Sequence, residues 1–90
     1  MKFAPRHVHF VGIGGSGMSG IAEVLATQGA RVTGSDAVDS QTLDQLRARG
    51  ITVMVGHDAT HIGDAQAVVI SSAIREDNPE VLAARARRIP

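Results

Sequence analysis

Along this chain of 90 residues, short apolar runs typical of strands alternate with segments in which apolar residues recur at helical spacing. Short runs rich in β-branched and apolar residues predict four strands, at residues 7–11, 30–36, 51–55 and 67–70. After the first run, apolar residues recur at positions i, i+3, i+4 and i+7, which predicts a helix face made of Met18, Ile21, Ala22 and Leu25. Gly29 stands where that helix would end.

Two more helices are predicted further along the chain. The first has a capping serine, two inward leucines and a terminal glycine, at Ser40, Leu43, Leu46 and Gly50. The second should begin at Asn78-Pro79-Glu80, which combine an N-cap, a proline at the first helical position and an acid in the first turn, and should run to about Arg87. Residues 56–66 have room for only one or two helical turns.

Strands that alternate with helices predict a single α/β domain with a parallel sheet and right-handed crossovers, covered by helices on both faces. We expect the strand order 3-2-1-4. In such sheets ligands bind beyond the carboxyl ends of the strands, where the strand order reverses, here between the first and fourth strands.

A glycine-rich turn joins the first strand to the first helix. Gly12, Gly14 and Gly17 fit the pattern G-x-G-x-x-G, in which the glycines permit the tight turn, the approach of an anion and close helix packing. Free N–H groups and the positive helix end would attract a phosphate group there. The pattern is typical of Rossmann-like nucleotide-binding domains, although glycines would also serve a close strand-to-helix crossing without a ligand.

Four polar segments should converge on this edge of the sheet, at residues 12–17, 35–36, 56–58 and 71–74. Asp36 lies nineteen positions after Gly17, where the dinucleotide-binding pattern has an acid that accepts hydrogen bonds from ribose hydroxyls. A loop-capping role for Asp36 is the alternative. Ser35 would assist through its hydroxyl or only close the turn.

The histidines divide into three groups. His57 and His61, four residues apart beside Asp58, suggest metal ligands, but no third strong ligand is evident and we expect no metal site. His57, at a strand's carboxyl end, is expected to contact a base or sugar, and His61 to be a surface residue. His7 and His9 are expected to be structural or edge-exposed.

Ser71 and Ser72 lack the surroundings of a nucleophile, so we expect them to donate hydrogen bonds to a phosphate or sugar. The basic end of the last helix, with Arg85, Arg87 and Arg88, is interpreted as a solvated face.

The composition of the chain limits the classes of partner that it can be expected to bind. Nine basic and nine acidic residues cancel, and only two aromatic residues are present, which argues against nucleic-acid or anionic-membrane partners. No cysteine is available for a disulfide or a thiolate metal site. Residues 1–6 lack the apolar region of a secretory signal, so we expect a cytoplasmic protein.

The glycine turn and its downstream blocks together resemble the Mur ligase family of peptidoglycan synthesis, and within it the branch that adds L-alanine. The resemblance spans nearly the whole chain. It rests on residues 9–25, Gly34-Ser35-Asp36, Gly56-His57-Asp58, Ser71-Ser72-Ala73-Ile74, Asp77-Asn78-Pro79-Glu80-Val81 and Arg87-Arg88-Ile89-Pro90.

The resemblance implies that residues 1–90 form the N-terminal UDP-sugar-binding domain of a three-domain ligase, which activates UDP-N-acetylmuramate with ATP and Mg²⁺ for attack by L-alanine. The diphosphate would lie along the turn, at Gly12, Gly14, Gly15, Ser16, Gly17 and Met18. The uridine would contact Ser35, Asp36, His57, Ser71, Ser72, Ala73 and Ile74.

The chain lacks the lysine-bearing motif G-x-x-x-x-G-K-[ST], and its only lysine is Lys2. We therefore expect this chain to contain no catalytic residue and to bind substrate without ligating it. An NAD(P)-binding domain of a dehydrogenase or redox regulator is the main alternative, because Asp36 and the glycine turn would serve adenosine ribose and pyrophosphate equally well. A third alternative is an interaction domain that binds no small ligand.

Overall fold

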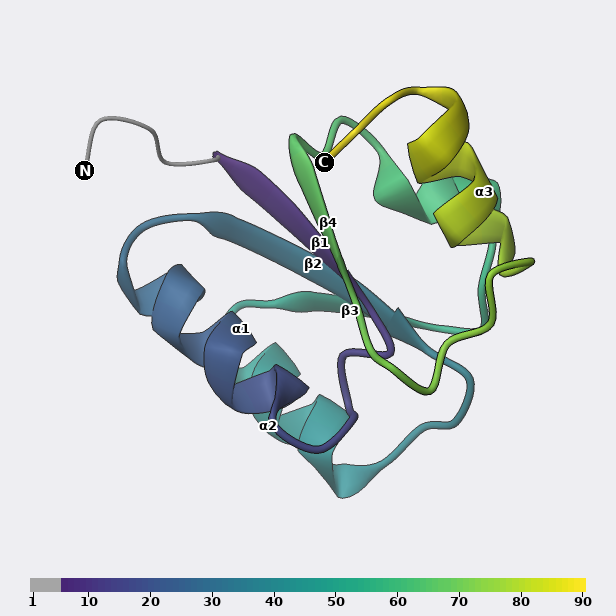
Figure 1. Cartoon of the computed structure of the whole chain (residues 1–90). Coiled ribbons are helices and arrows are strands. Elements are labelled where there is room, and N and C mark those ends of the chain that lie inside the picture. Colours follow the sequence, from purple (N-terminus) through teal and green to yellow (C-terminus); the bar gives the residue numbers. More distant parts are fainter. Residues whose placement is uncertain (1–5) are drawn as a thin grey trace.

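The computed structural model describes residues 6–90, so the predictions for residues 1–5 lie outside the described residues. Four strands and three α-helices alternate along the chain, with one short 3-10 helix between the third and fourth strands (Figure 1). Their bounds are β1 His7–Val11, α1 Met18–Thr27, β2 Arg31–Asp36, α2 Gln41–Ala48, β3 Thr52–Val55, η1 Ala59–Ile62, β4 Ala67–Ile70 and α3 Pro79–Ala86.

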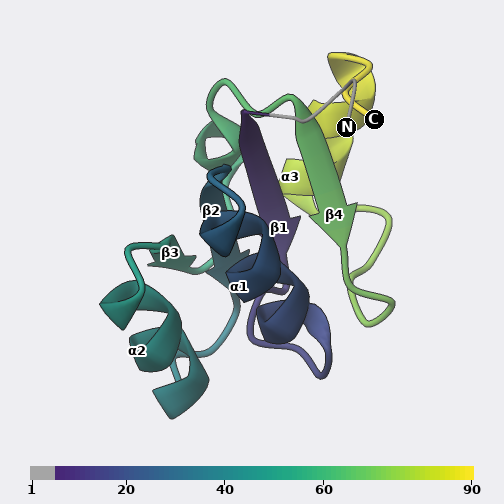
Figure 2. The same cartoon turned by 90° about the vertical axis from the view of Figure 1, so that its left-hand side faces the viewer.

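The four strands form one parallel sheet in the order β3-β2-β1-β4, which confirms the predicted topology (Figure 2). The central strand β1 pairs with β2 on one side and with β4 on the other, so that Phe10 lies opposite both Gly34 and Val69. The strand order reverses between β1 and β4. The glycine turn leaves the end of β1 at this point.

Helices cover both faces of the sheet, and the two covered faces differ in chemistry. On one face, α1 and α2 pack over an apolar core that includes Val8 and Phe10 of β1 (Figure 1). Burial of a side chain such as Phe10 contributes about 1.5–3 kcal/mol. Because side chains alternate along a strand, His7 and His9 point to the opposite face, which α3 and η1 cover.

Local signals set the helix ends as the sequence predicts. The hydroxyl of Ser40 accepts a hydrogen bond from the N–H of Leu43 at 3.3 Å. The side-chain oxygen of Asn78 accepts one from the N–H of Glu80 at 2.9 Å, with Pro79 at the first helical position. Gly29 follows α1 with φ +97°, a conformation that favours glycine.

The structure decides between the two alternatives for His7 and His9 and corrects the prediction for His61. β1 is a central strand, so His7 and His9 are buried rather than edge-exposed, and their role is structural. His61 is not a surface residue: its side chain is 21% exposed, and its ring contacts the carboxylate of Glu80 at 3.0 Å. The reason is the same in both cases: beside buried apolar residues such as Val81, the face beneath α3 and η1 holds a row of polar side chains that contact one another.

No helix among residues 6–90 has the length and apolar character needed to cross a membrane. The longest, α1, has ten residues, whereas a spanning helix needs about twenty.

Candidate functional site

The glycine turn is tied to the end of β2 through backbone hydrogen bonds. The N–H groups of Gly12 and Ile13 both donate to the carbonyl oxygen of Ser35, at 2.8 and 3.0 Å. Gly12 and Gly17 have φ +82° and +81°, so side chains at these positions would strain the backbone. The turn therefore has one fixed shape, held by the neighbouring strand.

Several N–H groups of the turn are available to a ligand. Within the described residues, those of Ser16, Gly17 and Ser19 donate to no protein acceptor. They lie at the N-terminal end of α1, where the helix dipole contributes a partial positive charge. This arrangement can bind an anion without any charged side chain.

The turn packs closely against the segment that follows β4. A Cβ atom built on Gly12 would lie 3.0 Å from Cβ of Ser71 and 3.1 Å from Cδ1 of Ile74. One built on Gly15 would lie 3.4 Å from Oγ of Ser71. The structure thus brings together two of the segments that the sequence placed at this edge.

Asp36 lies beside the turn at the end of β2. Its Oδ2 accepts a hydrogen bond from the N–H of Gly14 at 3.0 Å, and its Oδ1 accepts a longer one from the N–H of Val38 at 3.3 Å. The loop-capping contacts of the alternative interpretation are therefore present. The carboxylate is half-buried and still has lone pairs for a further donor such as a ribose hydroxyl.

A pocket of about 370 Å³ opens beside the turn. Its lining combines three predicted site residues with the segment that leads into α3, and consists of His57, Ala73, Ile74, Arg75, Asp77, Asn78 and Pro79. Ile74 contributes to this lining and also contacts Gly12, so the pocket and the turn adjoin. Ser72 is exposed and does not line the pocket, and the Ser71 hydroxyl accepts a hydrogen bond from the N–H of Ala73 at 3.3 Å.

The side chain of Ser35 does not line the pocket. Its side chain is fully buried on the α3 face of the sheet. Its hydroxyl donates to Oε1 of Glu80 at 2.7 Å and lies 2.9 Å from Nδ1 of His57. Ser35 therefore supports the site through its carbonyl oxygen and through Glu80, while its hydroxyl is engaged inside the protein.

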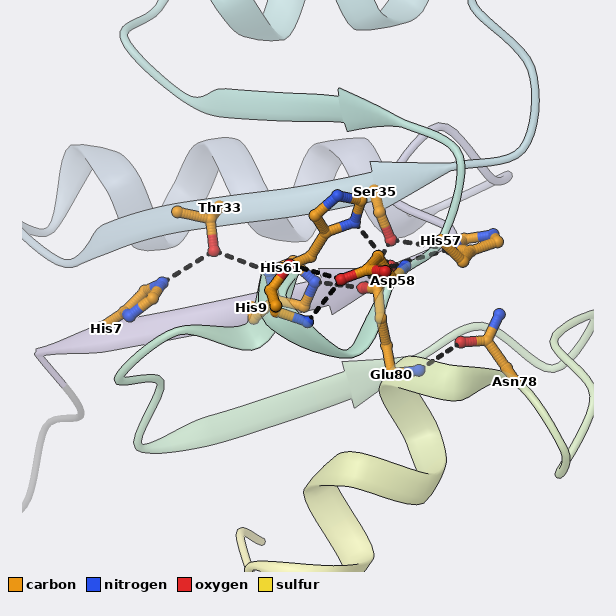
Figure 3. A network of polar contacts seen from close by, with 10 residues as sticks. His7, His9, Thr33, Ser35, His57, Asp58, His61, Asn78 and Glu80 are labelled. Carbon is orange, nitrogen blue, oxygen red and sulfur yellow. Dashed lines mark hydrogen bonds and ion pairs between the residues drawn. The ribbon is translucent and has the colours of Figure 1, made fainter.

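Glu80 is the residue that sequence reasoning missed. The sequence predicts only that it stands in the first turn of a helix, whereas the structure shows its side chain 0% exposed. Its carboxylate accepts five hydrogen bonds, which Figure 3 shows converging from three histidines and their neighbours. The donors are His9 Nε2 at 2.5 Å, Ser35 Oγ at 2.7 Å, His61 Nδ1 at 3.0 Å, His57 Nδ1 at 3.1 Å and the Asp58 N–H at 3.2 Å.

The buried carboxylate of Glu80 stays ionised because its donors outweigh its burial. Burial alone would raise the pKa of Glu80, but the hydrogen bonds from His9, Ser35 and His61 lower it to about 2. A signal for this arrangement was present in the sequence. His9 and Thr33 lie side by side in register on the same face of β1 and β2, with Ser35 two residues further on, and such a buried polar row requires a partner.

The polar row continues towards the other end of the sheet. The hydroxyl of Thr33 lies 2.7 Å from Nδ1 of His9 and 2.7 Å from Nε2 of His7, and Nδ1 of His7 lies 2.8 Å from Oδ1 of Asp64. Burial lowers the pKa of His7, against the opposing effect of its contact with Asp64. This layer connects the interior to an exposed ion pair between Arg31 and Asp64.

Comparison with known proteins assigns the family. Residues 7–90 match the model of the Mur ligase family, catalytic domain. Over all 90 residues the chain is 66% identical to the UDP-N-acetylmuramate–L-alanine ligase of Variovorax paradoxus and 60% identical to that of Methylibium petroleiphilum, and it spans 19% of the length of each. The fold matches the crystal structure of UDP-N-acetylmuramate–alanine ligase MurC from Thermotoga maritima with a TM-score of 0.91 and 39% identity, over 97% of this chain and 20% of that one. This chain belongs to the Mur ligase family.

Proposed function

We propose that this chain binds the UDP part of UDP-N-acetylmuramate, as the N-terminal domain of a ligase that joins L-alanine to that substrate. The observation that carries the proposal is the close approach of the pocket to the turn: Ile74 lines the pocket, and its Cδ1 would lie 3.1 Å from a Cβ atom built on Gly12, so the two features adjoin. A nucleoside diphosphate has a matching form, with an anionic group and a flat base linked by a ribose.

The diphosphate is proposed to lie along residues 12–18. Hydrogen bonds from neutral N–H groups to a charged phosphate contribute about 1.5–3 kcal/mol each, and the helix dipole adds about 0.3–1 kcal/mol. Because the N–H groups of Gly12 and Gly14 already have acceptors, those of Ser16, Gly17 and Ser19 would make the main contacts. The absence of a side chain at Gly15 lets the phosphate approach the backbone.

The uridine is proposed to extend from Asp36 into the pocket. Asp36 would accept from the ribose hydroxyls, while His57 and residues 71–74 would surround the nucleoside. Ser35 would act indirectly, through its carbonyl oxygen and Glu80. The relatives support a ligase over the NAD(P)-binding alternative, because the chain matches them along its whole length and not only at the glycine turn.

ATP and Mg²⁺ do not fit the residues of this chain. The sequence contains no lysine-bearing phosphate loop, and residues 6–90 contain no lysine at all. We therefore assign no step of the ligation to this chain, and propose that ATP, Mg²⁺ and L-alanine are bound elsewhere in a longer, cytoplasmic ligase. Incubation of the chain with UDP-N-acetylmuramate, ATP, Mg²⁺ and L-alanine should release no phosphate, and turnover by a clean preparation would contradict this assignment.

Titration of the ¹⁵N-labelled chain with UDP-N-acetylmuramate and, separately, with NADH tests the proposal. UDP-N-acetylmuramate should shift the amide resonances of residues 14–18 and of Ile74, because these form the turn and the adjoining wall of the pocket. The resonance of Gly50, at the distant end of α2, serves as an internal control and should stay unchanged. Shifts at residues 14–18 with NADH alone would overturn the proposal in favour of a dinucleotide cofactor.

A further inference from the structure

His57 lies between the buried carboxylate of Glu80 and the pocket. Its Nδ1 faces Oε2 of Glu80 at 3.1 Å and Oγ of Ser35 at 2.9 Å, and the ring lines the pocket. Figure 3 shows the ring directed away from the cluster around Glu80. Within residues 6–90, the second ring nitrogen, Nε2, has no hydrogen-bond partner, and His57 retains 15% of its side-chain exposure. One nitrogen is therefore held by the protein, and the other is left for a ligand.

The contacts of Oε2 of Glu80 determine which nitrogen of His57 carries the hydrogen. The backbone N–H of Asp58 also points to Oε2, at 3.2 Å, and a backbone N–H can only donate. The carboxylate of Glu80 is also ionised and has no hydrogen of its own, so Oε2 only accepts and Nδ1 of His57 has to be the donor. A neutral imidazole has a single N–H, which leaves Nε2 as an unprotonated acceptor on the side of the pocket.

We propose that Glu80 is a positioning residue that holds His57 in the Nδ1–H tautomer, so that Nε2 offers the base site one hydrogen-bond acceptor and selects uracil over cytosine. The inference rests on the proposed function, because it takes a uridine diphosphate as the ligand. Uracil has an N–H at ring position 3, which can donate to Nε2. Cytosine has a lone pair at that position, so its binding would leave two acceptors face to face.

Asn78 adds the complementary donor to the same pocket. Its side-chain oxygen accepts from the N–H of Glu80 at 2.9 Å, which fixes the amide orientation. The side-chain NH₂ group has no partner within residues 6–90, and Asn78 lines the pocket, so this group can donate to a ring carbonyl. The remaining charged groups of the lining, Arg75 and Asp77, are exposed and paired with each other at 3.1 Å. The pocket thus presents one acceptor and one donor, which match an imide edge.

His61 provides a matched control for His57. Its Nδ1 contacts the same Oε2 of Glu80 at 3.0 Å, and its side chain is similarly buried. Unlike His57, His61 does not line the pocket. Substitution of His61 therefore removes an equal contact on Glu80 while it leaves the pocket acceptor in place.

The tautomer of His57 is measured directly from the ¹⁵N shifts of its ring nitrogens in the free chain at pH 8. We expect Nδ1 to carry the hydrogen and Nε2 to show the shift of an unprotonated nitrogen. An unconstrained imidazole prefers the opposite tautomer, so finding the hydrogen on Nε2 would overturn the proposal. Glu80→Gln should retain the Nδ1–H tautomer, because the Asp58 N–H requires the amide oxygen at the Oε2 position, whereas Glu80→Ala should release it. If Glu80→Ala does not fold, the tautomer measured in the unmodified chain decides whether the proposal stands.

Calorimetric titration with UDP and CDP tests the selection. The unmodified chain should bind UDP about tenfold more tightly than CDP, the value of about one neutral hydrogen bond. His57→Asn keeps an N–H for Glu80 but has no atom at the Nε2 position, so the ratio should fall clearly below that of the unmodified chain, while His61→Asn should retain it. Equal affinity for UDP and CDP in the unmodified chain would overturn the selection. Absence of UDP binding would instead refute the proposed function, and the tautomer would still decide the role of Glu80.

Discussion

Replacement of Glu80 by glutamine should destabilise the protein at neutral pH and have little effect in acid. The substitution keeps the size and shape of the side chain but removes the charge that five donors surround. The amide NH₂ group would take the Oε1 position, where the ring of His9 and the hydroxyl of Ser35 can each reorient. Glu80→Gln therefore isolates the contribution of the ionised carboxylate.

The magnitude follows from the pKa of Glu80, which lies at about 2 against an ordinary value of 4.5. Each tenfold change in proton affinity is worth about 1.4 kcal/mol, so the folded state favours the ionised form by about 3 kcal/mol. Because the folded-state pKa lies below the unfolded one, this stabilisation is complete above pH 4.5 and is lost as the pH falls towards 2. A domain of this size has a free energy of unfolding of about 5–14 kcal/mol, so the variant should still fold.

Urea denaturation followed by far-UV circular dichroism measures the effect, since the chain has no tryptophan or tyrosine for fluorescence. The gap between the unmodified chain and Glu80→Gln should be about 3 kcal/mol at pH 7 and should narrow at pH 4 and pH 3. Glu23→Gln, which removes a carboxylate paired with Arg49 at 3.5 Å on the surface, should change the free energy of unfolding by less than about 0.5 kcal/mol. A gap under about 1 kcal/mol at pH 7, or one that is independent of pH, would refute the role assigned to the charge.

Two further predictions concern a crowded glycine and the proposed ribose contact. Gly34→Ala should lower the free energy of unfolding by about 1–3 kcal/mol, because the added Cβ would lie 2.5 Å from Cδ1 of Ile13. Gly20→Ala, in helix α1 with no atom within 4 Å of the new Cβ, should instead raise it by about 0.5–1 kcal/mol, and thermal unfolding that shifts both variants alike would contradict the packing argument. Asp36→Ala should weaken binding of UDP-N-acetylmuramate by about 1–3 kcal/mol in calorimetry, and an unchanged affinity would leave Asp36 with its loop-capping role alone.

The order and ends of the elements could be predicted from the sequence because each depends on local signals. Ser40 and Asn78 cap their helices as expected. The spacing of Leu43 and Leu46 identifies the face that α2 buries. Alternation of strands and helices leaves few topologies, so the strand order follows as well.

The contents of the face beneath α3 could not be predicted in the same way. An acid in the first turn of a helix is usually exposed and stabilised by the helix dipole, and that local explanation was sufficient for Glu80. Its burial depends on His9, Ser35 and His61, which lie 71, 45 and 19 residues away in the sequence. The alternating polar positions of β1 and β2 indicate a buried polar row, but they do not identify Glu80 and His61 as its partners.

The two layers on either side of the sheet differ in how they fix a helix. Apolar side chains beneath α1 and α2 act through close packing, because dispersion forces have no preferred direction. Hydrogen bonds do, so a carboxylate that accepts five of them also fixes the orientation of the first turn of α3. One wall of the pocket is built from the segment that enters α3. The hydrogen bonds of Asn78 and Glu80 therefore position the end of that wall next to α3, which lowers the binding free energy that a nucleotide must spend on ordering it.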